Sequence, residues 1–215
     1  MKTDPGQFIL ENTGIMSPPH VPEVKLHLAD EAHDLWLKTE DELEEIGLPP
    51  PFWAFAWAGG QGLARYVLDH PDCVACKRVV DFASGSGLVA IAAMKAGASK
   101  VLAADIDPWT GTAIGLNAKL NGVAVDYTRD DLVGEDIDAD VLLAGDVFYD
   151  QAFAAALIPW FERLASNGVA VLVGDPGRAY LPKDRLEALA VYEVPVTRAL
   201  EDSEVKRTTV WQFRG

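Results

Sequence analysis

The sequence predicts an α/β fold, in which a doubly wound parallel sheet is covered by helices on both faces. From Arg78 onward, short apolar stretches typical of buried strands alternate with stretches typical of helices, and this alternation predicts a parallel sheet. The stretch VVDFASGSG at residues 79–87 is typical of a buried strand that ends in an acid and leads into a glycine turn. Glycines there let the backbone lie close to a ligand, and the amides that open the next helix can hold an anionic group. These features indicate a site for a nucleotide-containing cofactor.

The first half of the predicted sheet has strands with helices between them. The strands are expected at residues 79–82, 100–105 and 123–128, and the helices at residues 88–96 and 108–120. Pro108 suits the first turn of its helix, because the missing N–H would have no partner there. Asn121 and Gly122 are typical of a helix end.

The second half of the predicted sheet ends in a different kind of strand pairing. The expected elements are strands at residues 140–145 and 168–174, a helix after Asp150, a helix at residues 182–190, and final strands at residues 191–197 and 206–213. The strand DVLLAG is almost continuously apolar, as in strands buried on both faces. Asp150 is expected to cap the helix that follows it, and Pro159 to bend that helix. The final two strands are joined too closely for a crossover helix, so they are expected to form an antiparallel pair at the edge of the sheet.

Residues 1–77 are expected to form a separate layer against this core. Residues 24–28 are predicted to be extended and residues 30–45 to be helical, with prolines at 49–51 ending that helix. The aromatic and glycine-rich segment at residues 52–62 is expected to pack beside the cofactor site.

The composition is typical of a soluble protein. The chain has 215 residues, a hydrophobic content of 49% and no linker or compositional break, so we expect one domain over residues 1–215 with its core at residues 78–215. No apolar run approaches the roughly 20 residues that a membrane-spanning helix needs, so no membrane partner is expected. The first residues lack the features of a secretory signal or a transit peptide, and we therefore expect a cytoplasmic, bacterial protein that works as a monomer.

The formal net charge is -15. Such a field repels phosphate backbones, which argues against nucleic acid as a substrate and favours a lysine-bearing protein. The alternative that the acidic surface serves only solubility stays open. Cys73 and Cys76 form one CVAC without a second pair, so no metal or redox role is predicted. The histidines lack the spacing of metal ligands: His20, His27, His33 and His70.

The glycine turn leaves two classes of nucleotide cofactor open. GSGLVA also satisfies the loose dinucleotide fingerprint, and Asp105 lies near the spacing expected of a ribose-binding acid. A dinucleotide domain is normally followed by a further catalytic domain. A parallel sheet that ends in an antiparallel pair is instead the outline of the seven-strand S-adenosylmethionine-dependent methyltransferases. The C-terminal strands therefore favour a methyltransferase, and a nicotinamide-dependent oxidoreductase is kept as an alternative.

Several segments, in chain order, make the expectation narrower: PPPFWAFAWAGGQGLARYVLD, VVDFASGSGLVAIAA, VLAADIDPWTGTAIGLNAKLNG, DVLLAGDVFYD and VLVGDPGR. Together they resemble the electron-transfer flavoprotein β-subunit lysine methyltransferases, which belong to the seven-strand protein lysine methyltransferases. The GSG and DIDP elements are shared by many methyltransferases, whereas AFAWAGGQ, GDVFYD and GDPGR are narrower. The resemblance runs from about Pro49 to Gly215. It implies a class I, Rossmann-like fold, S-adenosylmethionine as the cofactor, and the β subunit of electron-transfer flavoprotein as the protein substrate.

The ends of the first two strands hold the predicted cofactor contacts. Asp81 can reach the methionine ammonium of the cofactor through water, and Gly85 and Gly87 leave room for the methionine tail. Asp105 can accept hydrogen bonds from both ribose hydroxyls, because a carboxylate has two acceptor oxygens. Ile106 is included in the predicted cofactor site as its neighbour.

Other cofactor contacts come from the loops around the sheet. Asp131 follows the third strand, where this class of methyltransferase usually contacts the adenine. Trp57 is similar to the tryptophan that family members place against the cofactor, and an aromatic face is a suitable neighbour for a sulfonium cation. Its alternative role is core packing. Asp107 is left open between a cofactor contact and a cap on the helix after Pro108.

Asp146 and Tyr149, in GDVFYD, are the predicted catalytic residues. They lie at the carboxyl end of the expected fourth strand, where open α/β sheets bind their ligands. The alternative role of Asp146 is a helix cap, for which Asp150 is better placed. The resemblance implies that this DxxY motif orients the acceptor amine. Asp146 would bind the incoming lysine ammonium and aim the amine, and Tyr149 would be a second hydrogen-bond partner.

Two further functions are weighed against this prediction. DIDP and NAKLNG also resemble the ribosomal-protein methyltransferases, so an enzyme of the same fold that acts on a ribosomal protein or a small amine is the main alternative. A non-catalytic binding module is disfavoured, because the cofactor and DxxY positions are all filled.

Overall fold

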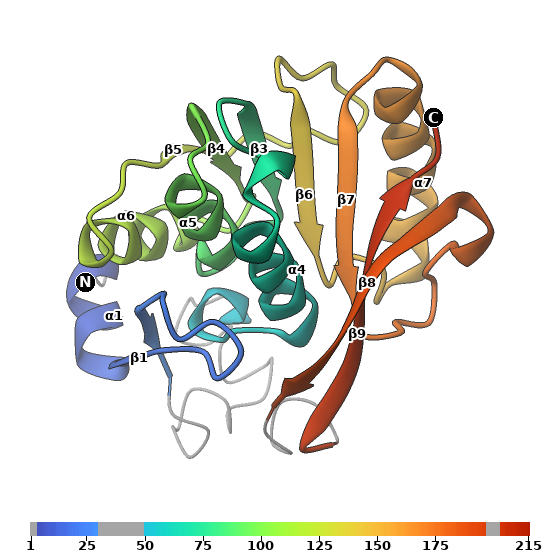
Figure 1. Ribbon diagram of the computed structural model, residues 1–215. Coiled ribbons are helices and arrows are strands. Elements are labelled where there is room, and N and C mark those ends of the chain that lie inside the picture. The colour runs from blue at the N-terminus through green and yellow to red at the C-terminus, as the bar shows by residue number, and fades with distance from the viewer. Residues whose placement is uncertain (1–3, 30–49, 197–202) are drawn as a thin grey trace.

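A seven-stranded sheet forms the centre of the molecule (Figure 1). The computed structural model describes residues 4–29, 50–196 and 203–215. The strand order is β5-β4-β3-β6-β7-β9-β8, in which β3 to β7 run parallel and β9 runs antiparallel to both of its neighbours. The strands are β3 (Arg78–Phe82), β4 (Lys100–Ala104), β5 (Asp126–Thr128), β6 (Val141–Gly145), β7 (Ala170–Asp175), β8 (Leu186–Pro195) and β9 (Val205–Phe213). The predicted α/β sheet with its antiparallel C-terminal pair is confirmed.

The path of the chain through the sheet places a ligand site at the ends of β3 and β6. These strands are neighbours, with Asp81 of β3 beside Leu143 of β6. The chain nevertheless leaves β3 towards β4 and β5 and returns to β6 only afterwards. Open α/β sheets bind their ligands at such a reversal, in the crevice beyond the carboxyl ends of the strands.

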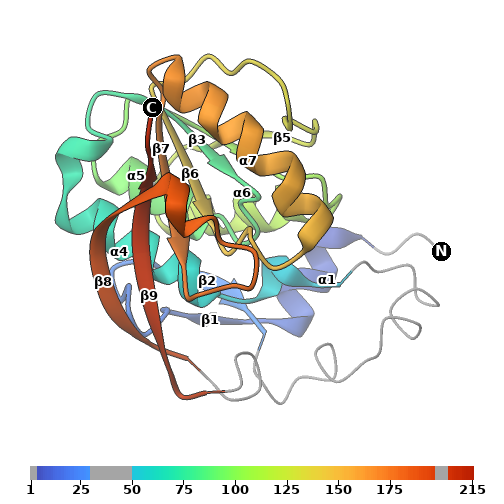
Figure 2. The ribbon, with the colours of Figure 1, turned by 90° about the vertical axis from the view of Figure 1, so that its right-hand side faces the viewer.

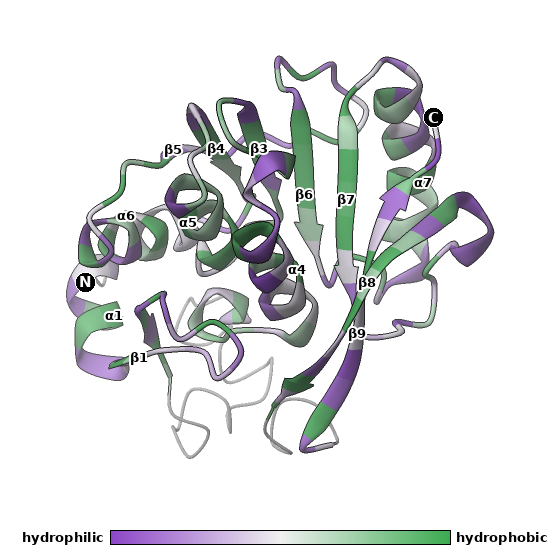
Figure 3. Ribbon diagram, in the orientation of Figure 1, coloured by the Kyte–Doolittle hydropathy of each residue, from purple (hydrophilic) through white to green (hydrophobic). Residues whose placement is uncertain are grey.

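Helices cover both faces of the sheet, as Figures 1 and 2 show. They are α4 (Ala58–Asp69), α5 (Leu88–Lys95), α6 (Thr110–Leu120) and α7 (Gln151–Ser166). Leu143 packs in the core shared with α4 and α5, whereas Leu142 packs in the core shared with α7. Successive positions of a strand covered on both sides are expected to alternate in this way. Figure 3 accordingly shows β6 and β7 as largely apolar strands, while β9 carries more hydrophilic residues.

The helix α7 begins where the sequence predicts. Asp150 caps it by accepting a hydrogen bond from the Phe153 amide at 2.8 Å. The helix then continues through Pro159, and the residues directly after the proline, Trp160 and Phe161, are buried against the sheet. No helix in the described part of the chain combines the length and the apolar character that a bilayer crossing needs.

The prediction of a helix at residues 182–190 is wrong. A short 3₁₀ turn covers Lys183–Arg185, and β8 then starts at Leu186. The segment is rich in alanine, leucine and glutamate, which favour helices. It lies beside β9, however, and the two strands pair from Leu186 to Pro195, with a shift of register between Ala188 and Ala190. Pairing over that length outweighs the local helix preference.

The N-terminal residues form a small layer against α6 and the segment before α4. Its elements are α1 (Pro5–Asn12), β1 (Gly14–Met16) and β2 (Leu26–Leu28). Phe8 of α1 meets Trp109 edge to face at a centroid distance of 5.1 Å, and Ile9 is fully buried. The extended segment expected at residues 24–28 contains β2, whereas α1 was not predicted. The helix expected at residues 30–45 lies outside the described residues.

Candidate active site

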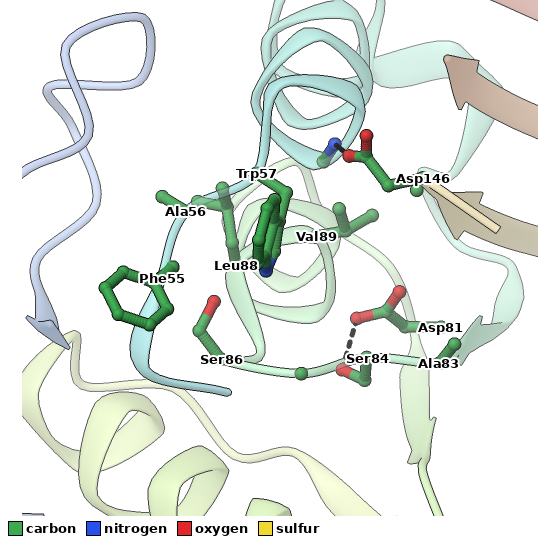
Figure 4. Close-up of a pocket in the computed structure, with 13 residues that line it drawn as sticks. Phe55, Ala56, Trp57, Asp81, Ala83, Ser84, Ser86, Leu88, Val89 and Asp146 are labelled. Atoms are coloured by element: carbon green, nitrogen blue, oxygen red, sulfur yellow. Dashed lines mark hydrogen bonds between the residues drawn. The ribbon is translucent and has the colours of Figure 1, made fainter. Parts of the chain in front are cut away.

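A pocket lies where β3 and β6 end, between these strands, α4 and the start of α5 (Figure 4). Its lining residues are Phe55, Ala56, Trp57, Gly60, Asp81, Ala83, Ser84, Gly85, Ser86, Leu88, Val89, Gly145 and Asp146. Figure 4 shows the Trp57 ring on one side and Asp81 and Asp146 on the other. The pocket therefore brings together four of the predicted site residues, Trp57, Asp81, Gly85 and Asp146.

The glycine turn between β3 and α5 has the backbone conformation that its sequence predicts. Gly85 and Gly87 have φ values of 52° and 79°, in the left-handed region that favours glycine. They do different work. A Cβ on Gly85 would meet nothing closer than 3.8 Å, whereas a Cβ on Gly87 would lie 3.1 Å from Ile114 of α6. Gly85 lines the pocket, and Gly87 instead lets the turn pack closely on α6.

Asp81 is a buried carboxyl group at the end of β3. Its side chain accepts hydrogen bonds from the Ser84 hydroxyl and from the Ala90 amide, the latter at 2.9 Å. Asp81 is only 1% exposed, and burial raises its pKa to about 7, although both hydrogen bonds act to lower it. A cationic group that enters the pocket would favour the ionised form of this carboxyl.

Asp105 lies directly after β4 and is tied to the glycine turn. Its Oδ2 accepts a hydrogen bond from the Gly85 amide at 2.9 Å, and its Oδ1 accepts one from the Asp107 amide at 3.0 Å. A carboxylate oxygen can accept more than one hydrogen bond, so both oxygens retain capacity for a ligand. Ile106, the next residue, is 65% exposed. Neither residue lines the pocket itself.

Asp107 and Asp131 both make local turn contacts. The Asp107 carboxylate accepts a hydrogen bond from the Trp109 amide at 2.8 Å, and burial raises the pKa of Asp107 to about 6. This contact forms a turn just before α6, whose N-cap residue is Trp109 and which has no side-chain cap. Asp131 is exposed and accepts a hydrogen bond from the Val133 amide at 3.0 Å, and it is not among the residues that line the pocket.

Asp146 is held firmly at the end of β6. Its backbone has a φ of 58°, which aspartate tolerates better than most residues. Its Oδ2 accepts a hydrogen bond from the Gly60 amide at 3.0 Å, and its Oδ1 accepts hydrogen bonds from the Arg178 guanidinium at 2.6 Å and 3.1 Å. Sequence reasoning gave no role to Gly60 or Arg178, although both lie in motifs that it singled out, AFAWAGGQ and GDPGR.

Close contacts between glycines explain how α4 reaches Asp146. A Cβ on Gly59 would lie 2.3 Å from the Gly174 carbonyl oxygen and 2.5 Å from Asp146 Oδ2. A Cβ on Gly145 would lie 2.8 Å from the Gly60 Cα. Only glycines allow backbone to meet backbone so closely. The start of α4, a helix that sequence reasoning did not predict, therefore rests on the carboxyl ends of β6 and β7, with its positive end directed at the Asp146 carboxylate.

Tyr149 lies at the rim and not in the lining of the pocket. It is 57% exposed. Its ring lies 6.4 Å from that of Phe52 and 6.2 Å from that of Phe153. Phe52 in turn lies 5.9 Å from Trp57, whose indole N–H donates to the Phe52 carbonyl at 3.1 Å. An aromatic row thus leads from the pocket to the surface.

The described residues hold no group of three or more histidine, cysteine or acidic side chains that could bind a metal ion. Cys73 and Cys76 are free. The polar groups that line the pocket include the Asp81 and Asp146 carboxyl groups and the Ser84 and Ser86 hydroxyls.

Comparison with known proteins supports the fold described above. The family model described as ribosomal protein L11 methyltransferase (PrmA) matches residues 66–148. Among solved structures, magnesium protoporphyrin IX methyltransferase (ChlM) from Synechocystis PCC 6803 with bound SAM is similar in fold, with a TM-score of 0.52. That likeness covers 73% of this chain and 78% of the other at 16% sequence identity.

Curated relatives match nearly the whole chain. The electron transfer flavoprotein beta subunit lysine methyltransferase of Xenopus laevis is 39% identical over 98% of this chain and 87% of its own length. The protein of the same name from Homo sapiens is 36% identical over 96% of this chain and 81% of its own length.

These animal relatives bear on the expected bacterial origin and on the ribosomal-protein alternative. The expectation of a bacterial protein is contradicted, because the near-full-length relatives come from animals. The likeness to ribosomal-protein methyltransferases spans only part of the chain, so an enzyme of that kind is not favoured. The chain is an S-adenosylmethionine-dependent protein-lysine methyltransferase and belongs to the electron transfer flavoprotein beta subunit lysine methyltransferase family.

Proposed function

We propose that this protein transfers methyl groups from S-adenosylmethionine to lysine side chains of the β subunit of electron-transfer flavoprotein. The observation that carries the proposal is the 39% identity, over 98% of the chain, to a protein named for that activity. The matched length includes the pocket-lining residues and the segment that holds Asp146 and Tyr149.

The residues at the ends of β3 and β4 fit the cofactor. Bound there, S-adenosylmethionine would supply an electrophilic methyl group. The buried Asp81 carboxyl is suited to the amino-acid ammonium, since a nearby cation would stabilise its ionised form. Asp105 offers two acceptor oxygens to a ribose diol, with Ile106 beside it. Trp57 offers an aromatic face to a cationic sulfur.

Other parts of the proposed cofactor site receive less direct support. Gly87 would act by setting the conformation of the turn, since its contact with Ile114 keeps α6 close. Asp131 is proposed to contact the adenine only by its position after β5. Its contact with the Val133 amide leaves one carboxylate oxygen for such a role.

The acceptor lysine has to become a neutral amine before it can attack. Taking a lysine from a pKa of about 10.4 to its neutral form at pH 7 costs about 4 to 5 kcal/mol. In the proposed mechanism, Asp146 first binds the lysine ammonium and, once the proton has passed to solvent, aims the amine. Tyr149 supplies a second orienting hydrogen bond at the rim. Positioning of this kind supplies much of the rate in reactions of two bound substrates.

The charge of the protein supports a lysine-bearing partner. A net charge of -15 attracts a basic loop from a distance. It also repels nucleic acid, which we do not expect as a partner, and we expect the enzyme to act as a monomer. Methylation keeps the positive charge of a lysine but replaces its N–H donors, so the modified flavoprotein is expected to accept electrons from its dehydrogenases less readily.

Mass spectrometry of the flavoprotein after incubation with enzyme and cofactor tests the proposal. We expect mass increments of whole methyl groups on lysines of the β subunit. A parallel reaction with ribosomal proteins is the control for substrate class. Methylation of a ribosomal protein with none on the β subunit would replace the proposed substrate.

A further inference from the structure

Arg178 is bound to Asp146, the residue that the proposed function expects to bind the incoming lysine. Its Nη2 and Nε lie 2.6 Å and 3.1 Å from Asp146 Oδ1. The two side chains are 22% and 11% exposed, respectively, so little water screens the pair. A lysine that approaches Asp146 through the pocket would therefore meet a guanidinium bound to the same group.

The turn after β7 fixes where Arg178 lies. Asp175, the last residue of β7 and only 1% exposed, accepts hydrogen bonds from the Gly177 amide at 2.6 Å and the Arg178 amide at 2.8 Å. Gly177 has a φ of 97°, which favours glycine. The sequence DPGR thus builds a tight turn that directs Arg178 to Asp146.

The charged, polar and apolar groups around Asp146 come from several elements. β3 contributes Asp81, which lines the same pocket, and β7 contributes Asp175 beneath the turn. α4 contributes its positive end through the Gly60 amide, and the first turn of α5 contributes the apolar residues Leu88 and Val89. Among the described residues that line the pocket, Asp81 and Asp146 are the ionisable ones.

We propose that Arg178 is a positioning residue that acts through Asp146 to favour the neutral amine form of the acceptor lysine. This deepens the proposed function and rests on it. An unpaired Asp146 would hold the lysine as an ammonium, which cannot attack. With Arg178 bound, part of the carboxylate charge is already balanced, so Asp146 holds the incoming ammonium less strongly and the ammonium loses its proton at a lower pH. Charges within about 4 to 6 Å of an ionisable group move its pKa by about one to three units.

The pH dependence of kcat tests this role, because kcat reports ionisations in the enzyme–substrate complex. Arg178→Met removes the charge, and Arg178→Lys keeps it while losing the planar fork. We expect Arg178→Met to move the rise of kcat upward by about one pH unit or more. Its rate at neutral pH should fall about tenfold or more and recover towards the parent rate in alkaline buffer. Arg178→Lys should keep the position of the parent profile.

Controls separate this role from a purely structural one. Calorimetry should show cofactor affinity within a few fold of the parent for both variants. If Arg178→Met does not fold, Arg178→Gln carries the same expectation, because it too removes the charge. A kcat profile that keeps the parent's apparent pKa in the uncharged variant, or moves equally in Arg178→Lys, would overturn the role of Arg178 alone. A parent enzyme that methylates no lysine of the β subunit would instead overturn the proposed function.

Discussion

The two halves of the candidate site are built in different ways. The half at the ends of β3 and β4 comes mainly from one continuous stretch, residues 81–90, joined by Asp105 from the next strand. The half at the ends of β6 and β7 is assembled from Gly60, Asp146 and Arg178, which lie far apart in the chain. A local sequence motif can predict the first half, whereas the second half forms only when distant parts of the chain come together on folding.

The halves also differ in charge balance. Asp81 accepts hydrogen bonds from a hydroxyl and an amide, so its described contacts provide no positive charge. Asp146 is paired with a guanidinium. The first half therefore offers a carboxyl group without a cationic partner among its described contacts, whereas the carboxylate of the second half already has a guanidinium beside it before an acceptor arrives.

Asp146→Ala should break the acceptor half and leave the cofactor half intact. We expect turnover to fall about a hundredfold or more, because the amine loses its guide, while calorimetry shows cofactor affinity within a few fold of the parent. Asp146→Asn, which tolerates the positive φ, separates loss of charge from backbone strain. Asp150→Ala is the control: it removes the cap of α7 and should cost about 1 kcal/mol of stability with turnover retained. Equal loss of turnover and cofactor affinity in Asp146→Ala would assign Asp146 to the cofactor.

Asp105→Ala should weaken the cofactor half of the site and leave the acceptor half intact. Removing the ribose acceptor and the partner of the Gly85 amide should cost about 1 to 3 kcal/mol of cofactor binding. Affinity should fall roughly ten- to a hundredfold by calorimetry. Asp126→Ala, at the start of β5 in an exposed ion pair with Lys100, should bind like the parent. Tight binding of a nicotinamide dinucleotide by the parent would show that the wrong cofactor had been assigned.

Gly59→Ala tests the backbone contact that supports the acceptor half. The new Cβ would lie 2.3 Å from the Gly174 carbonyl oxygen, so we expect a loss of about 1 to 3 kcal/mol of stability in urea denaturation. Gly115→Ala is the matched control, since it is also a helical glycine but has nothing within 4 Å of its Cβ position. That change should stabilise the protein by about 1 kcal/mol. Similar stabilities for the two variants would mean that α4 can move away from β6 and β7 at little cost.

The sequence predicts those parts of the molecule that local patterns determine. The glycine turn, the acids that end β3 and β4, the cap of α7 and the C-terminal strand pair all follow from residue types at short spacing. The first part of β8 does not, because residues 186–190 favour a helix and only pairing with β9 makes them a strand.

Arg178 and Gly60 could not be assigned from the sequence for a related reason. Their contact with Asp146 depends on backbone packing between α4, β6 and β7. The glycines at 59, 145 and 174 were visible in the sequence, but a glycine alone does not say which backbone it meets. Tyr149 shows the converse, since a motif names it while its ring lies at the rim, 57% exposed.

The pH dependence of cofactor binding sharpens the difference in charge between the halves. Burial raises the pKa of Asp81 to about 7, and a cationic ammonium gains most from the ionised carboxylate. Affinity for S-adenosylhomocysteine should therefore level off only about one pH unit above this pKa and fall as the pH drops through it, by about fivefold between pH 7 and pH 6. Calorimetry from about pH 5.5 to 7.5 measures this slope.

The stability of the free protein should respond to the same group with the opposite sign. Because folding raises the pKa of Asp81 from its ordinary value of 3.8 to about 7, its protonated form favours the folded state. That contribution is fully present below about pH 3.8 and is lost as the pH rises through about 7.

Asp81→Asn tests whether Asp81 causes the pH dependence of cofactor affinity. Its side chain cannot ionise, so the variant should flatten the pH dependence of affinity between pH 6 and 7. A slope that persists in Asp81→Asn would place the titrating group elsewhere, and an affinity that does not change with pH in the parent would mean that Asp81 does not meet a cation.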